Sequence, residues 1–396
     1  MAGQGHLEVR WVESEGDIPA QVWDACFGPP HEGRWWYRAM ERGGLGDQFS
    51  FAYGMIERHE GGQVTPVGIA PTFVMALPLE IVAPPVLQRV LRVLERFTTR
   101  LTRVRTLFVG SPCADEGRLG LLSGVDAREA VRVTQVALVA RAKTLGVRLI
   151  VWKDMDEGLS RVLRDEAPSH ALVEVVSFPG TRTAVPPGGI TGYMKSLKGS
   201  NRSNIKRKLK RSDEMGPLDV AVVQHPDSAE QREIFDLFWQ TYTRATTKFE
   251  RLTPEFFALL AAAEQSWFVT LRHPQDGKLA AFMLCFRLGD RVINKFVGFD
   301  YSMDPDWFLY FRLFAAAMDW ASSIGASEMQ SGQTGYSAKL TLGHSLVPLT
   351  NFAVHRWGVV NAILRKVAKG IDWDSLDHDL AERAKGESGK SPSTGA

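Results

Sequence analysis

The sequence predicts an α/β protein built from two similar halves, and three observations support this fold class. Strand-like and helix-like segments alternate along most of the 396 residues. In each half a long amphipathic helix ends in Leu-Gly or Ile-Gly and turns directly into a strand, at Gly146 and again at Gly325. Residues 181–192 (TRTAVPPGGITG) are rich in Pro and Gly, as is typical of a linker. We therefore expect two domains and a disordered tail, at residues 1–184, 185–375 and 376–396.

The first half is predicted from periodicity and from the positions of Pro and Gly. Apolar and β-branched segments predict strands at 7–12, 50–57, 67–81, 106–109, 147–152 and 171–178. Amphipathic spacing predicts helices at 19–26, 34–42, 85–100, 127–144 and 159–165. Gly146 defines the end of its helix, because glycine commonly follows the last helical residue. The basic amphipathic stretch 82–109 either packs on the core with a solvated Arg face, which we favour, or contacts a membrane surface peripherally.

The second half repeats the alternation. Its predicted helices are 190–197, 201–214, 230–245, 254–264, 306–323 and 359–369. Its predicted strands are 267–272, 279–288, 292–299, 327–331 and 349–356. With the linker between them, the two halves favour a tandem duplication over an ordinary run of helix–Gly–strand units.

Composition excludes several classes of protein. The chain has 47 Lys+Arg against 45 Asp+Glu, a formal charge of +2, so any site for an anionic partner must be local. Its three cysteines are scattered and form no CxxC pair, which excludes a disulfide framework and a cysteine zinc site. The N-terminal segment has no apolar core of a signal peptide, and no apolar run is long enough to span a membrane. We expect a cytoplasmic protein with no transmembrane segment.

The segment 198–211 (KGSNRSNIKRKLKR) is the most unusual in the chain, because half of its residues are basic and none is acidic. On a helix its cations recur at i, i+4 and i+8. Like charges at that spacing destabilise a helix, so the stripe suggests an anionic ligand such as the phosphates of a coenzyme, a carrier arm or tRNA. The alternative is a solvated surface helix balanced by acids such as Asp213 and Glu214. The candidate anion-binding residues are Arg202, Asn204, Lys206, Arg207 and Lys210.

A second segment, 331–344 (SGQTGYSAKLTLGH), places small and polar residues directly after a predicted buried strand. Ligands bind at the carboxyl ends of strands in open α/β sheets. Lys339 lies one helical turn after Tyr336, where it could polarise a carbonyl or hold a carboxylate; the alternative is an ordinary connection with the lysine in solvent. The candidate substrate-cleft residues are Gln333, Gly343, His344 and Trp36. Trp36 belongs to an aromatic cluster that we interpret first as a core anchor and second as an acyl-pocket wall.

Other chemistry is not indicated. The chain has no GxGxxG after a strand, no P-loop and no GxSxG elbow. His344 and His355 are too irregularly spaced to be metal ligands, so we expect no metal site. We also expect no permanently bound cofactor.

The second half resembles the FemAB-like and BioF2-like branch of the GNAT acyltransferases, which includes predicted peptidoglycan-biosynthesis N-acyltransferases. The resemblance covers residues 190–357 and runs through YMKSLK at 193–198, NRSNIKRK at 201–208, TPEFF at 253–257, DGKLAA at 276–281, GFD at 298–300, Gly325, Lys339-x-x-x-Gly343, Pro348 and His355. It implies tandem GNAT-like domains around a shared cleft, each a mixed, largely antiparallel sheet flanked by helices. Lys339 matches the family's cleft lysine, and residues 204–207 match its basic helix.

The resemblance implies an N-acyltransferase that moves an acyl group from acyl-CoA or acyl-carrier protein to a small amine or peptide by direct attack. We expect Lys339 and Tyr336 to stabilise the oxyanion, with Asp300 as a candidate proton acceptor. The pyrophosphate loop of ordinary GNATs is absent before residue 306. Residues 227–254 have room for one helix only, not the long coiled-coil arm of tRNA-dependent Fem proteins, which favours a thioester donor. The alternatives are aminoacyl-tRNA-dependent transfer and a non-catalytic RNA-binding module that uses the basic helix.

Overall fold

The computed structural model describes residues 5–78, 103–245 and 250–382, and the chain folds into two compact units. Among the described residues, unit 1 holds those up to Gly28, those from Gly46 to Pro179 and those from Pro348 onward. Unit 2 holds Pro29–Leu45 and Gly180–Val347. The units differ from the predicted domains 1–184 and 185–375 because a segment of each half belongs to the other unit.

Unit 1 contains an eight-stranded sheet within its described residues. Its strands are β1 (His6–Val12), β2 (Ser50–Glu60), β3 (Gln63–Pro78), β4 (Arg103–Val109), β5 (Gly120–Leu121), β6 (Leu149–Met155), β7 (Val173–Val176) and β15 (Thr350–His355). Its helices are η1 (Glu15–Asp17), α1 (Ala20–Cys26), α6 (Ala127–Thr144), α7 (Glu157–His170), α14 (Gly358–Ala368) and α15 (Trp373–Leu376).

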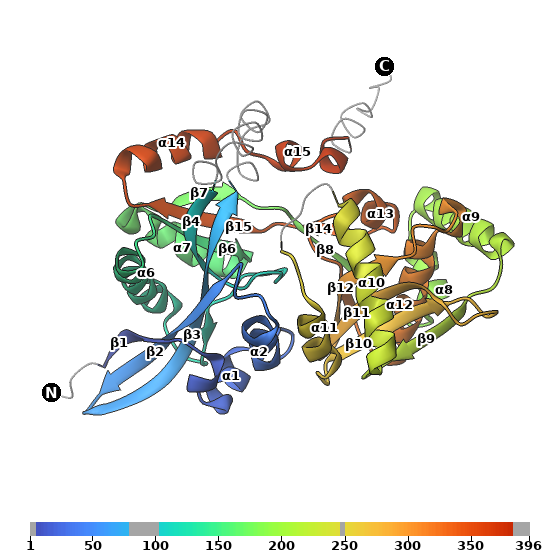
Figure 1. Cartoon of the computed structure of the whole chain (residues 1–396). Coiled ribbons are helices and arrows are strands. Elements are labelled where there is room, and N and C mark those ends of the chain that lie inside the picture. The colour runs from blue at the N-terminus through green and yellow to red at the C-terminus, as the bar shows by residue number, and fades with distance from the viewer. Residues whose placement is uncertain (1–4, 79–102, 246–249, 383–396) are drawn as a thin grey trace, which may run out of the picture. The chain divides into compact units, whose positions relative to one another are not determined.

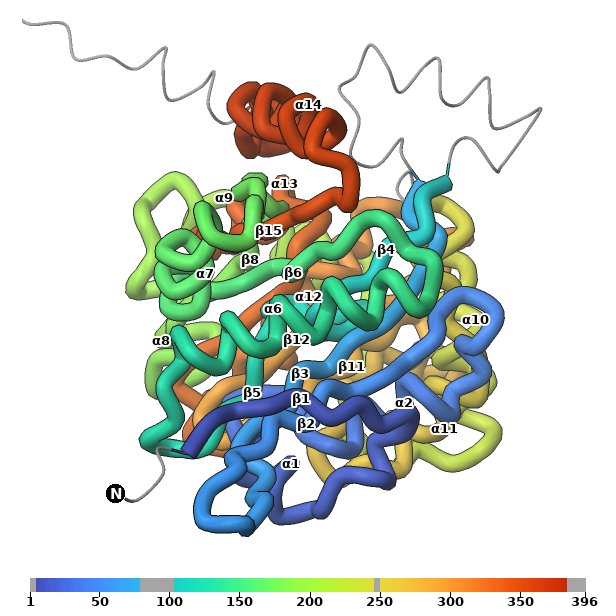
Figure 2. Tube along the Cα trace, turned by 90° about the vertical axis from the view of Figure 1, so that its left-hand side faces the viewer, coloured from blue at the N-terminus to red at the C-terminus, as the bar shows by residue number. Residues whose placement is uncertain are grey.

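The strand order in unit 1 is β1-β2-β3-β4-β6-β15-β7, with β5 paired to β3. All neighbouring strands are antiparallel except β4 and β6, which are parallel. Helix α6 lies between these two strands in the sequence. Helix α6 lies across the strands and packs on α7 (Figure 2). Its apolar face, with Val131 and Leu138 fully buried, joins the core formed by the sheet. Asp126 caps its first turn and Gly146 follows it with φ 66°, so local signals define both ends of the helix.

The described residues of unit 2 contain a seven-stranded sheet. Its strands are β8 (Gly180–Ala184), β9 (Asp219–Val223), β10 (Ser266–Arg272), β11 (Leu279–Leu288), β12 (Arg291–Phe299), β13 (Glu328–Gln330) and β14 (Ser345–Val347). Its helices are α2 (Arg34–Arg42), α8 (Gly189–Ser196), α9 (Gly199–Met215), α10 (Ser228–Arg244), α11 (Pro254–Ala261), η2 (Pro305–Trp307), α12 (Leu309–Ser323) and α13 (Tyr336–Thr341).

The two sheets have the same arrangement, which supports the predicted duplication. Unit 2 has the order β9-β10-β11-β12-β13-β8-β14, and its one parallel pair, β12 and β13, again flanks a long helix, α12. The sixth place is filled by β15 in unit 1 and by β8 in unit 2. Each of these strands therefore belongs to the sheet of the other half of the sequence.

Residues 181–192 are not a linker, contrary to the prediction. Their first part forms β8, which pairs with β13 on one side and β14 on the other. Thr181 is fully buried in this sheet. The Pro and Gly residues that suggested a linker form the turn between β8 and α8, where Gly188 and Gly189 both have positive φ.

Strand β11 lies within the sheet of unit 2 (Figure 1). It is buried on both faces, and its alternating side chains face two cores. Met283 and Cys285 belong to the cluster formed with α8, α9 and α12. Phe282 and Phe286 face the other way and contact aromatic rings of α11 and α2. The segment that holds α2 packs in unit 2 for this reason.

Several predictions fall on the boundaries of the described residues. The predicted helix 85–100, and most of the basic stretch 82–109, lie outside them. The segment between β9 and α11 contains the single helix α10 among its described residues. Part of the predicted disordered tail is described, and Leu380 in it is buried. None of the described helices is long and apolar enough to cross a membrane.

Candidate functional site

The candidate site in unit 2 begins where the parallel strands β12 and β13 stop pairing. Their last paired residues are Ile293 and Gln330. Directly beyond this point β12 contains a bulge, because Asn294 and Phe296 pair with consecutive residues of β11 and Lys295 has no counterpart. Bulges of this kind bend a strand and redirect side chains, and they are common next to active sites. The bulge therefore marks the end of the parallel pair as the candidate position for ligand.

The segment after β13 is fixed by a short chain of hydrogen bonds. The Nδ1 atom of His344 lies 3.1 Å from the carbonyl oxygen of Lys339, and its Nε2 atom lies 3.1 Å from Ser331 Oγ. A carbonyl oxygen only accepts, so the geometry assigns the ring proton to Nδ1 and makes Nε2 the acceptor of the serine proton. His344 thereby ties helix α13 to the end of β13.

His344 is a neutral side chain at physiological pH. Burial, and next the nearby charge of Lys339, lower its pKa to about 3. Both ring nitrogens are engaged and the residue is 3% exposed. His344 therefore positions the segment that carries Lys339 and does not itself line an open surface.

The structure places both predicted oxyanion donors in α13, one turn apart. Tyr336 is its first residue and is fully buried, and Lys339 is 9% exposed. Lys339 is therefore buried in a helix, which differs from the alternative interpretation, in which it lies in solvent. Gln333 is half-buried in the preceding loop.

The basic helix α9 begins directly beside α13. Asn201 Nδ2 donates to the carbonyl oxygen of Leu340 over 3.3 Å. The hydroxyl of Tyr193, in α8, donates to the carbonyl of Leu342 over 2.6 Å. Gly343 closes the contact: its φ is 93°, and a Cβ there would collide with Cδ2 of Leu197. The two segments singled out in the sequence are thus neighbours in one unit.

The cationic stripe on α9 is only partly neutralised. Arg211, toward its C-terminal end, pairs with Glu214 and Asp306. Asp213 pairs instead with Arg312 of α12. Acids that could have balanced the helix are therefore engaged at that end. The stripe residues Arg202, Lys206 and Lys210 form no ion pair with any described residue.

Two neighbours of the stripe behave differently. Arg207 donates to Asn204 Oδ1 over 3.3 Å, an intrahelical contact of two predicted anion-binding residues. Lys208 turns inward, with its Nζ 4.0 Å from the ring centroid of Phe311. Burial, and next the charge of Arg207, lower the pKa of Lys208. The first turn of α9 has no side-chain cap, so its leading N–H groups are further potential donors to an anion.

Asp300, the predicted proton acceptor, closes the turn after β12. Its carboxylate accepts from the Ser302 backbone N–H and hydroxyl over 2.9 and 2.6 Å, and it lies 3.2 Å from Lys278 Nζ. Burial alone would raise the pKa of Asp300, but these hydrogen bonds and the Lys278 charge lower it overall. It also lies six residues beyond the bulge region, on the order of 20 Å along the strand.

Trp36 lies in the core of unit 2 and does not line an open cleft, contrary to the cleft expectation. It is fully buried, and it contacts Phe256 and Phe286 edge-on at centroid distances of 5.8 Å. Lys295, the bulge residue, places its Nζ 4.9 Å from the Trp36 ring and 3.2 Å from Glu32. The core-anchor interpretation accounts for these contacts.

Sequence reasoning missed Asn294, Lys295 and Tyr310. The first two are functional candidates only because of the bulge, which depends on pairing with β11. Tyr310, in α12, has a buried hydroxyl with no hydrogen-bond partner in the described part of the chain. Burial raises its pKa well above the usual range, and Cys285 adds to the shift. The hydroxyl therefore stays protonated and can donate a hydrogen bond; the aromatic run in α12 gave no signal of this.

A separate surface cavity of about 650 Å³ lies between α9, β9 and α12. Leu209 and Asp213 line it from the helix, Val220 and Val222 from the edge strand, and Trp320 from α12. Lys339 and the three stripe residues are not among its walls. We therefore do not assign this cavity to the acyl site.

Comparison with known proteins identifies the domain. Residues 199–339 match the family model described as Acetyltransferase (GNAT) domain. The crystal structure of FemX superposes with a TM-score of 0.57 at 12% identity, covering 90% of this chain and 100% of that one. A tandem GNAT protein from the clavulanic acid biosynthesis pathway gives a TM-score of 0.49 at 9% identity, covering 89% and 99%. L-PGS from Bacillus licheniformis gives 0.46 at 11%, covering 67% and 85%. None of the curated proteins matches the chain.

The fold and the matched domain define an acyltransferase. Residues 199–339, within unit 2, match the GNAT domain, and the whole chain shares the fold of FemX.

Proposed function

We propose that this protein is an N-acyltransferase that uses unit 2 to move an acyl group from a thioester to an amine. The observation that carries this proposal is the hydrogen bond from Asn201 Nδ2 to the carbonyl of Leu340. It joins the start of the cationic helix α9 to α13, which carries Lys339. In this proposal the cationic helix binds the anionic part of the donor while Lys339 polarises its carbonyl.

The reaction is direct transfer within a ternary complex. The neutral amine attacks the thioester carbonyl, a C–N bond forms, and the C–S bond breaks as the thiolate leaves. Orientation of the two substrates removes much of the barrier, and the oxyanion that develops requires preorganised donors. Lys339 supplies the positive charge, with Tyr336 or a backbone N–H as the second donor. Tyr310 is the further candidate, because its protonated hydroxyl could donate to the thiolate.

The anionic part of the donor binds the stripe residues Arg202, Lys206 and Lys210, with Asn204 and Arg207 beside them. The absence of ion pairs at the three stripe residues, in the part of the chain that the structure describes, supports this role. Phosphates of CoA and the phosphopantetheine of a carrier protein share the required chemistry.

The amine proton needs an acceptor, and Asp300 is our proposal for it, through water. It is ionised at neutral pH, as acceptance requires, but its lowered pKa makes it a weak base. We therefore expect Asp300→Asn to reduce turnover less than Lys339→Ala.

A panel of donors tests this proposal. Native mass spectrometry of the purified protein would first identify any co-purifying ligand. Acyl transfer to a set of amines would then be measured with short-chain and long-chain acyl-CoA, acyl-carrier protein and charged tRNA. Transfer from a thioester supports the proposal, whereas transfer from none of the four donors contradicts it.

Aminoacyl-tRNA is the second candidate donor. The cationic stripe also suits an RNA backbone, for which binding would fall steeply with salt because each phosphate contact releases about one counterion. Activity with charged tRNA alone, falling steeply with salt in the same way, would identify aminoacyl-tRNA as the donor.

A further inference from the structure

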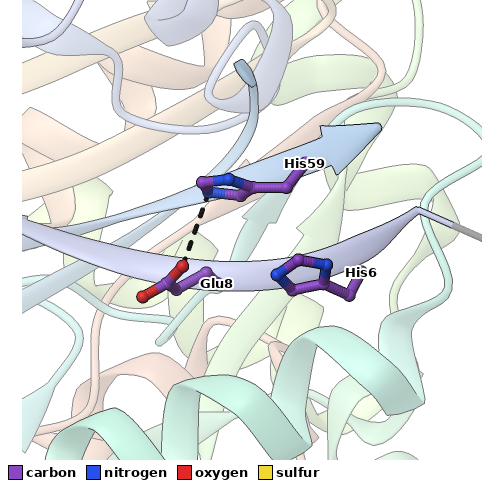
Figure 3. Close-up of side chains that lie close together, drawn as sticks. All are labelled: His6, Glu8 and His59. Carbon is purple, nitrogen blue, oxygen red and sulfur yellow. Dashed lines mark ion pairs between the residues drawn. The ribbon is translucent and has the colours of Figure 1, made fainter. Parts of the chain in front are cut away.

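Two histidines and a glutamate form a cluster on the first two strands of unit 1. His6 and Glu8 lie on β1, and His59 lies on β2 (Figure 3). His6 is directly opposite His59 in the antiparallel register, and Glu8 is two residues further along β1. Opposite residues and i, i+2 residues share a face of a sheet, so all three side chains project from the same side.

The three donor atoms lie within 4.8 Å of one another. His59 Nε2 is 3.6 Å from Glu8 Oε2, which is too long for a hydrogen bond. Two ligands of tetrahedral zinc, each ~2.0–2.1 Å from the ion, are separated by roughly 3.4 Å. The His59–Glu8 spacing, which is that of an ion pair, is therefore also close to the edge of such a site.

The donors are available to an ion. His59 Nε2 is buried and has no hydrogen-bond partner among the residues that the structure describes. The neighbouring carboxylate on this face, Glu57, is already engaged by Arg10 Nε at 2.9 Å. His6 is exposed and stacks on His59, with centroids 5.2 Å apart, and its donor atom lies within 4.8 Å of the other two.

We propose that His6, Glu8 and His59 bind a divalent transition-metal ion of the zinc class. Imidazole and carboxylate are ligands that Zn²⁺ accepts, and three protein ligands leave a fourth position for water. Strand β1 is the edge of its sheet and pairs only with β2 among the described strands. The ion would therefore fasten this edge strand to its neighbour.

Zinc binding to the full-length chain, without an affinity tag, tests the proposal. We expect one ion per chain by calorimetry, a higher melting temperature with Zn²⁺, and the visible spectrum of low-coordinate Co²⁺ on cobalt substitution. His59→Ala, His6→Ala and Glu8→Gln should each weaken Zn²⁺ binding by at least ~10-fold. The last two residues are exposed, so these variants remain informative if His59→Ala fails to fold.

His378→Ala is the matched control, because His378 also lies near a glutamate, 3.7 Å from Glu382, but outside the cluster. Its zinc affinity should equal that of the wild type. Equal affinity in His6→Ala, Glu8→Gln and the wild type would overturn the proposal, as would loss of binding in His378→Ala alone.

Discussion

Asp154 in unit 1 and Gly332 in unit 2 occupy the same place in the two sheets. Each lies two residues beyond the last paired residue of its parallel strand, Trp152 or Gln330, and each has a left-handed backbone, with φ of 56° and 59°. Glycine adopts this conformation freely, whereas for another residue it raises the conformational free energy by ~1–2 kcal/mol. The two units therefore share a backbone path but differ in the segment that comes after the strand.

In unit 1 that position is held by a closed polar network. The Asp154 carboxylate is bonded by the Ser177 hydroxyl and the Lys153 ammonium, and its backbone N–H donates to Asn351 Oδ1 over 2.8 Å. These bonds stabilise the left-handed backbone. In unit 2 the same position opens into the loop that leads to Lys339.

Asp154→Ala should destabilise the protein by about 2 kcal/mol, because it removes both side-chain bonds while the positive φ remains. Asp154→Asn should lower the free energy of unfolding by about half as much, since asparagine tolerates this backbone and still accepts a hydrogen bond from Ser177. Urea unfolding of the two variants measures the difference. Midpoints of both variants equal to that of the wild type would show that the network contributes nothing.

Gly343→Ala should lower the free energy of unfolding by roughly 1–2 kcal/mol and displace α13, because of its φ of 93° and the collision with Leu197. Thermal unfolding and acyl transfer would both report it. Gly358→Ala is the control: a Cβ there meets nothing within 4 Å and its φ is ordinary. A Gly343→Ala protein as stable and active as the control would refute the packing argument.

His344 should make stability depend on pH. Its pKa in the folded chain is about 3, below the ~6.5 of the unfolded chain, so the unfolded state binds more protons between these values. Stability is thus full above pH ~6.5 and falls as pH decreases. Between pH 7 and 5 the wild type should lose about 2 kcal/mol more than His344→Gln, which keeps a donor and an acceptor. Parallel losses in chemical unfolding would contradict a buried neutral histidine.

The stripe should control donor affinity. Arg202→Ala, Lys206→Ala and Lys210→Ala together should raise the KM for the donor by at least ~10-fold and flatten its salt dependence, because each removes a phosphate contact. Arg211→Ala is the matched control on the same helix, since that guanidinium is already paired with Asp306. Steady-state kinetics at two salt concentrations compare the stripe variant with Arg211→Ala. An equal rise in KM for Arg211→Ala would show that general surface charge, and not the stripe, controls donor affinity.

Local signals predicted single elements well. Helix α6 was predicted at its observed bounds from its amphipathic spacing and from Gly146, and β11 was predicted at 279–288 from one apolar run. The exchange of β8 and β15 between the sheets was not predictable. Each strand is short, and its partners lie more than a hundred residues away in sequence. Strand β8 therefore looked like part of a linker.

The site was predictable only where its residues are contiguous in the sequence. The basic helix and the 331–344 segment are contiguous in sequence, so their composition was visible. The contacts that organise them are not local: Asn201 reaches Leu340, and the bulge at Lys295 depends on the register with β11. Only the Ser331–His344 pair, within one segment, could have been proposed from spacing.

Turnover of Lys339→Ala with the donor found active is the most direct test of the central claim. Lys339 lies in α13 beside the cationic helix, and its charge is proposed to stabilise the developing oxyanion. We expect kcat to fall at least ~10-fold, with the donor KM and the melting temperature nearly unchanged. A folded variant with wild-type kcat would remove Lys339 from the reaction and contradict the account.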